Sequence, residues 1–179
     1  MPLSHFILRN FLSEGDKAVD ATCGNGNDTI LLAELVGSTG QVWGFDIQER
    51  AIAETRRRLS EAGLGSRVTL VHAGHEEMQQ HVNGPVKAVL FNLGYLPGGD
   101  HSMITRPETT GVALQHSLKL LAPGGIVMVT VYPGHGGGEK QTVDDWAAGL
   151  EPRQYHSWRM GQMNVISSAP YCILVQKAT

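Results

Sequence analysis

Cysteine and long hydrophobic runs are both scarce in this sequence. Its two cysteines, Cys23 and Cys172, are too few for a disulfide framework and do not have the pattern of a zinc site. The longest apolar stretches fall far short of the roughly 18 residues needed to span a bilayer. The first ten residues show neither a cationic leader nor a small-residue cleavage site. We therefore expect a protein of the reducing cytoplasm that is neither secreted nor inserted in a membrane.

The sequence also lacks a large excess of positive or negative charge. The chain carries 14 lysine and arginine residues against 17 aspartate and glutamate residues, which gives a formal net charge of −3. This balance provides no bulk attraction for nucleic acid, although a local basic patch could still hold phosphates. The 179 residues are 41% hydrophobic and contain no repeat or low-complexity linker. We expect a single domain over residues 1–179.

Apolar runs of strand and helix type alternate along most of the chain. The predicted strands cover 17–20, 41–46, 67–72, 86–92, 126–132, 155–160 and 171–177. The predicted helices cover about 4–12, 28–36, 47–59, 76–82, 107–121 and 139–150, and Pro123-Gly124-Gly125 is expected to separate the fifth helix from its strand. Continuous apolar strands between helices indicate a doubly wound α/β fold, whose seven-stranded, mostly parallel sheet has two final strands forming an antiparallel edge.

A glycine-containing loop joins the first predicted strand to the next helix. Gly24 and Gly26 allow a tight turn and a close approach of the backbone to a ligand. A dinucleotide fingerprint would need a third glycine near residues 27–29. The carboxylates of Asp20 and Asp28 instead favour a ligand with a cationic end, such as S-adenosylmethionine, although each could simply end a strand or cap a helix. The candidate cofactor residues here are Asp20, Thr22, Gly24, Asn25, Gly26, Asn27, Asp28 and Thr29.

A second acid ends the next predicted strand. Asp46 lies where a carboxylate can accept both hydroxyls of an adenosine ribose. Acids at two adjacent strand ends indicate a nucleoside site, and this placement suits S-adenosylmethionine and NAD equally. His75 follows the third strand and is placed to border the adenine, although it could as easily be an exposed loop residue. The candidate cofactor residues of these segments are Asp46, Ile47, Gln48, Gly74 and His75.

The most informative stretch follows the fourth predicted strand and runs from Asn92 to Asp100. It resembles the D/N-P-P-Y/F motif of amino-methyltransferases, with Leu93-Gly94 in place of the two prolines. An asparagine carbonyl can accept an amine hydrogen and so aim the nitrogen lone pair at a methyl group. Tyr95 can stack on a flat base. The alternative is a plain turn in which the tyrosine packs on the sheet.

Taken in order, several of these segments resemble one family over nearly the whole chain. They are Asp20-Ala21-Thr22, Gly24-Asn25-Gly26, Asp28-Thr29, Phe45-Asp46-Ile47-Gln48, Asn92 to Asp100, Thr109-Thr110 and Tyr132-x-Gly134-His135. The chain is similar to small bacterial proteins labelled rRNA methylases and to MnmM-type enzymes, which methylate the 5-aminomethyl group of wobble 2-thiouridine in tRNA. It departs from their pattern at Pro133, where histidine is common, and at Ala169-Pro170-Tyr171, where a Pro-Pro pair is usual.

The resemblance implies a class I, Rossmann-like methyltransferase fold, S-adenosylmethionine as the cofactor and the tRNA anticodon region as the partner. It also implies that Asn92 borders the cofactor. An alkylamine has a pKa of about 10.4 and is mostly protonated at pH 7, so a nearby group must accept or relay a proton. Asp100 suits positioning of the ammonium and a neutral His101 or His135 suits base work, although each could be a solvated loop residue. The candidate catalytic residues are Asn92, Tyr95, Asp100 and His135.

Contact with RNA phosphates would need cations. The densest source is the run Arg56-Arg57-Arg58, with Arg50 and Arg9, although such a run is usually a solvated helix face. A chain of this size offers little surface for holding tRNA, and a homodimer would enlarge it.

The sequence is also compatible with other functions. An rRNA or small-amine methyltransferase would use the same cofactor and the same asparagine. An NAD-linked oxidoreductase is disfavoured by the missing third glycine, and a non-catalytic RNA-binding module is disfavoured by the net charge.

Overall fold

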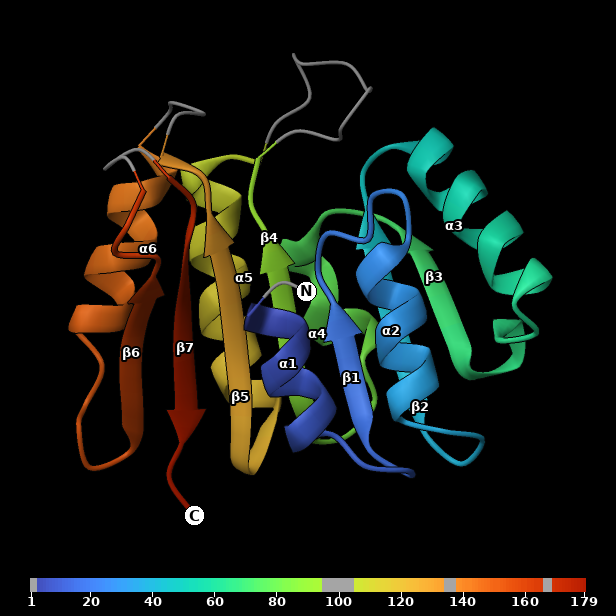
Figure 1. Cartoon of the computed structure of the whole chain (residues 1–179), viewed down its shortest axis with the longest axis horizontal. Helices are drawn as coiled ribbons and strands as arrows, with labels where there is room; N and C mark the ends of the chain where they lie inside the picture. Colours follow the sequence, from blue (N-terminus) through green and yellow to red (C-terminus); the bar gives the residue numbers. More distant parts are fainter. Residues whose placement is uncertain (1–2, 95–104, 134–137, 166–168) are drawn as a thin grey trace.

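The computed structural model describes residues 3–94, 105–133, 138–165 and 169–179, which fold around a seven-stranded sheet (Figure 1). The strands are β1 (Lys17–Asp20), β2 (Gln41–Asp46), β3 (Val68–His72), β4 (Val86–Asn92), β5 (Leu121–Val131), β6 (Tyr155–Gly161) and β7 (Tyr171–Lys177). The helices are α1 (Leu3–Phe11), α2 (Asn27–Leu35), α3 (Glu49–Glu61), α4 (Met78–His81), α5 (Pro107–Leu120) and α6 (Glu139–Ala148). Two 3-10 turns, η1 (Gly65–Arg67) and η2 (His75–Glu77), precede β3 and α4. The predicted alternation is confirmed.

The strand order β3-β2-β1-β4-β5-β7-β6 confirms the doubly wound sheet with an antiparallel edge. The first five strands in this order are parallel, whereas β7 is antiparallel to both β5 and β6. Strand order reverses between β1 and β4, which is where ligands bind in sheets of this type. Asp20 pairs in register with Gly44 and Leu90, so β2 and β4 each continue two residues further, to Asp46 and Asn92. Three polar strand ends therefore meet at one edge.

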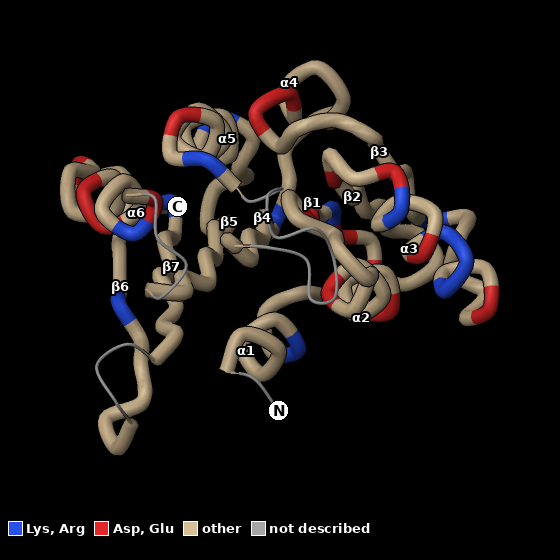
Figure 2. The backbone as a smooth tube through the Cα atoms, turned by 90° about the horizontal axis from the view of Figure 1, so that it is seen from above, with Lys and Arg blue, Asp and Glu red and all other residues tan. Residues whose placement is uncertain are grey.

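Helices cover both faces of the sheet, with α1, α2 and α3 on one side and α4, α5 and α6 on the other (Figure 2). Alternate strand residues fill the two resulting cores, because side chains along a strand point to opposite faces. Val19 and Phe91 belong to the core beneath α5, and Ala18 and Leu90 belong to the core beneath α2. Within the described part of the chain, no helix is both long and apolar enough to cross a membrane.

Two local predictions were wrong. Pro123-Gly124-Gly125 lies inside β5, which begins at Leu121, because the pairing of β5 with β4 shifts register there and Gly124 takes a positive φ of 69°. An irregular strand therefore accommodates residues that usually mark a turn. Ile47, expected on the buried face of the third helix, precedes α3 and is 49% exposed.

Candidate functional site

The loop between β1 and α2 is organised around the buried carboxyl group of Asp20. Its Oδ2 accepts a hydrogen bond of 2.6 Å from the Thr29 hydroxyl, and its Oδ1 accepts one of 3.2 Å from the Thr22 backbone N–H. Gly26 ends the turn with a φ of 80°, where a Cβ atom would lie 2.9 Å from the Thr55 side chain. Only glycine satisfies both the left-handed conformation and this close approach. The loop backbone is thus held at the carboxyl edge of the sheet.

The helix α3 secures the same loop from outside. The Thr55 hydroxyl donates to the Gly24 carbonyl at 2.9 Å, and the Arg58 guanidinium donates to the Asn25 carbonyl and, at 2.8 Å, to Asn27 Oδ1. Arg58 was predicted only as part of a basic run for RNA phosphates. The structure instead shows that it contacts the candidate cofactor loop.

The other arginines of that basic run differ in their contacts. Arg57 forms ion pairs with Glu54 and Glu61 on its own helix, at 2.7 and 2.5 Å. Its hydrogen bond with Glu54, followed by that with Glu61, raises the pKa of the Arg57 guanidinium. Arg50 and Arg56 are exposed. Arg57 is exposed as well, but two acids of its own helix offset its charge, so Arg50 and Arg56 are the better candidates for phosphate contacts.

Asp46, at the end of β2, lies beside this loop. Its Oδ2 accepts a hydrogen bond of 2.9 Å from the Gly24 N–H, and its Oδ1 accepts one of 2.9 Å from the Gln48 N–H. Burial raises the pKa of the Asp46 carboxyl, and the backbone hydrogen bonds from Gln48 and Gly24 oppose that shift. The carboxylate therefore ties the ends of β1 and β2 together.

Asn92, at the end of β4, joins the same group of contacts. Its backbone N–H donates to the Thr22 hydroxyl at 2.7 Å, and its side-chain amide nitrogen donates to Asp28 Oδ2. The other oxygen of Asp28 lies 2.5 Å from His5 Nε2. The structure therefore brings the predicted residues of the loop and of strand four into direct contact, and it adds a histidine from α1.

The electrostatics of this edge are negative. Burial, and then the charge of Asp28, raise the pKa of Asp20 to about 7. Burial followed by the same Asp28 charge raises the pKa of Tyr132. Three carboxyl groups within one cluster favour a ligand that carries positive charge, since a cation lowers their mutual repulsion.

His75 lies in the first turn after β3 but is buried, with 7% of its surface exposed. Its ring packs edge-on against Phe91 at 5.6 Å between centroids, and its Nε2 has no hydrogen-bond partner among the described residues. Desolvation lowers the pKa of His75, against opposing contributions from Glu76 and the Ala21 backbone. The alternative of an exposed loop residue is wrong, whereas contact with an adenine stays a prediction. A Cβ atom at Gly74 would lie 2.3 Å from a Glu76 oxygen, so a side chain there would require the flexible Glu76 carboxylate to move.

A second network supports the segment just after Asn92. The Gly94 N–H donates to the Thr105 hydroxyl at 3.0 Å, and that hydroxyl donates to Glu139 Oε2 at 2.7 Å. Glu139, at the start of α6, is nearly buried and also accepts a hydrogen bond of 2.6 Å from the Thr110 hydroxyl. Two helix ends thus hold the beginning of the predicted substrate segment. The remaining candidates Tyr95, Asp100 and His135, with His101, lie outside the described residues.

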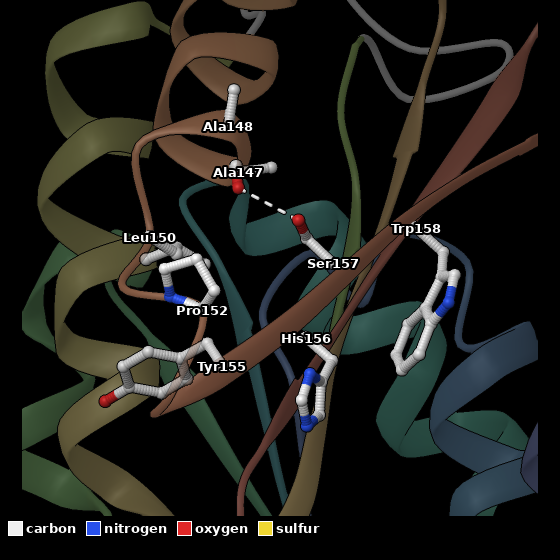
Figure 3. A pocket seen from close by; sticks show the side chains of 8 residues that line it. All are labelled: Ala147, Ala148, Leu150, Pro152, Tyr155, His156, Ser157 and Trp158. Atoms are coloured by element: carbon white, nitrogen blue, oxygen red, sulfur yellow. Dashed lines mark hydrogen bonds between the residues drawn. The ribbon is translucent and has the colours of Figure 1, made fainter.

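A separate hollow of about 290 Å³ lies between the end of α6 and the start of β6 (Figure 3). Its wall includes Leu150, Pro152, Tyr155 and Trp158. The Ser157 hydroxyl donates a hydrogen bond of 3.0 Å to the Ala147 carbonyl. The hollow is formed by a different part of the sheet from the strand ends of β1, β2 and β4, and it contains none of the predicted site residues.

This sheet order, with a glycine-containing loop after β1 and a carboxylate at the end of β2, defines the class I methyltransferase fold. The chain belongs to the family described as "Putative rRNA methylase", whose model matches residues 42–176. A solved "putative rRNA-methylase" from Clostridium thermocellum is 47% identical, with a TM-score of 0.94 over 97% of this chain and 95% of that one.

Two further relatives are informative. A "putative methyltransferase" from Streptococcus mutans, solved in complex with SAH, is 35% identical, with a TM-score of 0.89 over 98% of this chain and 96% of that one. The chloroplastic tRNA (mnm(5)s(2)U34)-methyltransferase of Arabidopsis thaliana is 40% identical over 83% of this chain and 58% of the plant protein. This chain therefore spans less than two thirds of the length of that curated relative.

Four residues of the site were missed by the sequence-based reasoning. His5, Thr105 and Glu139 were not singled out, and Arg58 was placed in a different role. Each contacts a segment at least 23 positions away in the chain, so no local sequence pattern predicts the contact. The exposure of the Ile47 side chain, next to Asp46, likewise became evident only from the position at which α3 begins.

Proposed function

We propose that this protein is an S-adenosylmethionine-dependent N-methyltransferase that converts 5-aminomethyl-(2-thio)uridine to 5-methylaminomethyl-(2-thio)uridine at the wobble position of tRNA. The observation that carries the proposal is Asn92, which stands at the end of β4 with its amide held by Asp28 at the edge of the cofactor loop. The family membership and the chloroplastic tRNA methyltransferase relative support it.

The residues at the strand ends fit the proposed cofactor. A carboxylate offers about four lone-pair sites, and Asp46 uses two of them for the N–H groups of Gly24 and Gln48. The remaining sites suit the two ribose hydroxyls. Asp20 and Asp28 place negative charge near the loop, which suits the amino and sulfonium groups. The relative solved with SAH supports this assignment.

The cofactor supplies an electrophilic methyl group, and the protein has to aim an amine at it. The Asn92 amide nitrogen faces Asp28, so its Oδ1 is left to accept a hydrogen from the substrate amine. That bond directs the nitrogen lone pair toward the methyl carbon. Once the substrate ammonium has lost a proton to water, its nitrogen would attack the methyl carbon as the carbon–sulfur bond breaks, which leaves SAH and a secondary ammonium.

The cysteines argue for methylation at nitrogen rather than at a ring carbon. Transfer to C5 of a pyrimidine needs a thiolate nucleophile, but Cys23 and Cys172 are both buried. Burial raises the pKa of Cys172 to about 12. Burial, followed by the charges of Asp20 and Asp46, raises the pKa of Cys23 further. Both thiols are therefore protonated at neutral pH.

The partner in this proposal is the tRNA anticodon region, and the expected compartment is the cytoplasm. A wobble base in a seven-membered loop is already partly unstacked, so flipping it costs less than extracting a paired base. Exposed Arg50 and Arg56 are candidates for phosphate contacts. The homodimer stays a prediction.

The substrate can be tested with isotope-labelled S-adenosylmethionine and three purified RNAs. They are tRNA that carries the 5-aminomethyl group, the same tRNA without it, and rRNA. We expect label only in the first, in a nucleoside identified by mass spectrometry as the methylaminomethyl uridine. Label in tRNA that lacks the amine, or only in rRNA, would contradict the proposal and favour rRNA, to which the family description points.

The role of the asparagine has its own test. Asn92→Ala should lower turnover by about a hundredfold or more while S-adenosylmethionine still binds, because lost positioning acts on the transition state. Asn83→Ala, at an exposed asparagine in the turn before β4, is the matched control. Normal turnover of Asn92→Ala would show that the amide does not position the amine.

A further inference from the structure

A chain of side-chain contacts links the amino-terminal helix to the predicted amine site. His5 Nε2 lies 2.5 Å from Asp28 Oδ1, and Asp28 Oδ2 accepts the hydrogen bond from the Asn92 amide. The three residues come from α1, α2 and β4. His5 and Asn92 lie 23 and 64 positions from Asp28 in the chain. His5 is the only one of the three that the proposed reaction does not use.

The chemistry of the groups fixes which atom donates in each contact. A carboxylate accepts hydrogen bonds and donates none, so His5 Nε2 and the Asn92 amide nitrogen must both be donors. An asparagine amide turned by 180° would present its NH₂ group to the incoming amine instead of its oxygen. The Asp28 carboxylate opposes that rotation, because the turned amide would place its own oxygen, an acceptor, against the carboxylate oxygen, which is also an acceptor.

The position of His5 follows from how α1 packs. Leu8 is fully buried in the core beneath α2, and His5 lies three residues earlier on the same helix face. The ring is therefore directed toward the first turn of α2, where Asp28 lies. The His5 and Asp28 side chains are 24% and 17% exposed, so the contact is shielded but not sealed from water.

We propose that His5 is a positioning residue for the amine acceptor site: it holds Asp28, and through Asp28 it keeps the Asn92 amide oxygen facing the substrate. The inference rests on the proposed function in assuming that Asn92 receives the amine. It means that α1 contributes a functional residue to the site. Without His5, Asp28 can rotate, and the amide loses the partner that selects its orientation.

The test compares His5→Ala, His5→Gln and the control Asn10→Ala on the aminomethylated tRNA. His5→Ala should lower kcat by about tenfold with KM for tRNA nearly unchanged, because positioning acts on the transition state. His5→Gln should restore most of kcat, since its amide nitrogen can replace Nε2 as a donor. Asn10→Ala should have no effect, because the Asn10 side chain donates to the Phe6 carbonyl of its own helix. A His5→Gln variant as slow as His5→Ala would overturn the proposal, as a proton acceptor cannot be replaced by an amide.

A second arm separates acting through Asn92 from a general loss of structure. In an Asn92→Ala background, adding His5→Ala should lower kcat little further, because the group that His5 orients is already gone. A full additional tenfold loss would overturn the proposal.

A third arm needs no turnover and so distinguishes this inference from the proposed function. The Asn92 side-chain amide resonance, assigned in a ¹⁵N NMR spectrum by its loss in Asn92→Ala, should shift in His5→Ala and stay in place in Asn10→Ala. If wild-type protein fails to methylate the tRNA but this shift occurs, the substrate is wrong and the orienting contact stands. If the resonance does not move, the contact does not hold the amide and the inference is overturned.

Discussion

Asp20 makes the stability of this protein depend on pH in a direction opposite to that of an ordinary paired carboxylate. Asp20→Asn should leave the free energy of unfolding nearly unchanged at pH 4 and raise it at pH 8. The reason is that burial, and then the charge of Asp28, raise the pKa of Asp20 to about 7. An asparagine fills the same space, can accept from the Thr22 N–H and can donate to the Thr29 hydroxyl.

The sign follows from proton binding by the two states. Near pH 4 the unfolded Asp20 carboxyl begins to release its proton, whereas the folded one keeps it until about pH 7. Raising the pH through this window therefore favours the unfolded chain, and the loss is complete above pH 7. A folded-state pKa about 3 above the ordinary value corresponds to roughly 4 kcal/mol. The asparagine variant does not titrate, so its advantage over wild type should grow to that order across the window.

The measurement is urea unfolding followed by tryptophan fluorescence at several pH values from 4 to 8. Asp145→Asn, at an exposed aspartate of α6, controls for the loss of one negative charge. The quantity of interest is the difference in unfolding free energy between Asp20→Asn and wild type at each pH. A difference that stays constant with pH, or a variant less stable than wild type at pH 8, would refute the reasoning.

Substitutions at three other residues test the cofactor site and the network that supports the segment after Asn92. Asp46→Ala should weaken S-adenosylmethionine binding by about 1.5–3 kcal/mol, the range for hydrogen bonds to a charged group, and calorimetry that finds full affinity would remove the ribose assignment. Glu139→Ala should lower the unfolding free energy by about 1–3 kcal/mol, because the hydroxyls of Thr105 and Thr110 lose their acceptor. Glu139→Gln should lose less, and equal losses would speak against the hydrogen bonds. Gly26→Ala should cost about 1–2 kcal/mol in urea unfolding for the left-handed backbone alone, and a neutral result would mean that the loop relaxes.

The carboxyl ends of the strands could be predicted because they depend on order along the chain. Alternating apolar strands and helices specify a parallel sheet, and parallel strands end at one edge. Asp20, Asp46 and Asn92 each close such a strand, so their meeting did not require knowledge of any side-chain contact. The doubly wound class follows from the same pattern.

Where local signals compete with pairing, the sequence was misleading. Pro123-Gly124-Gly125 has the composition of a turn, but β5 pairs with β4 on both sides of it and carries the chain through. Ile47 fits a helical stripe with Ile52, but Asp46 accepts the Gln48 N–H and α3 begins only at Glu49. Pairing with another strand decided the first outcome, and a local hydrogen bond before α3 decided the second.

The sequence by itself determined the alternation of elements, and with it the edge of the sheet at which the candidate site lies. Only the tertiary structure placed His5 on Asp28, Arg58 on the loop before α2, and Glu139 beneath the start of the substrate segment. The physical reason is the range of the interactions. Periodicity and turn composition act over a few residues, whereas a hydrogen bond between two helices depends on how both pack against the sheet, which no local spacing encodes.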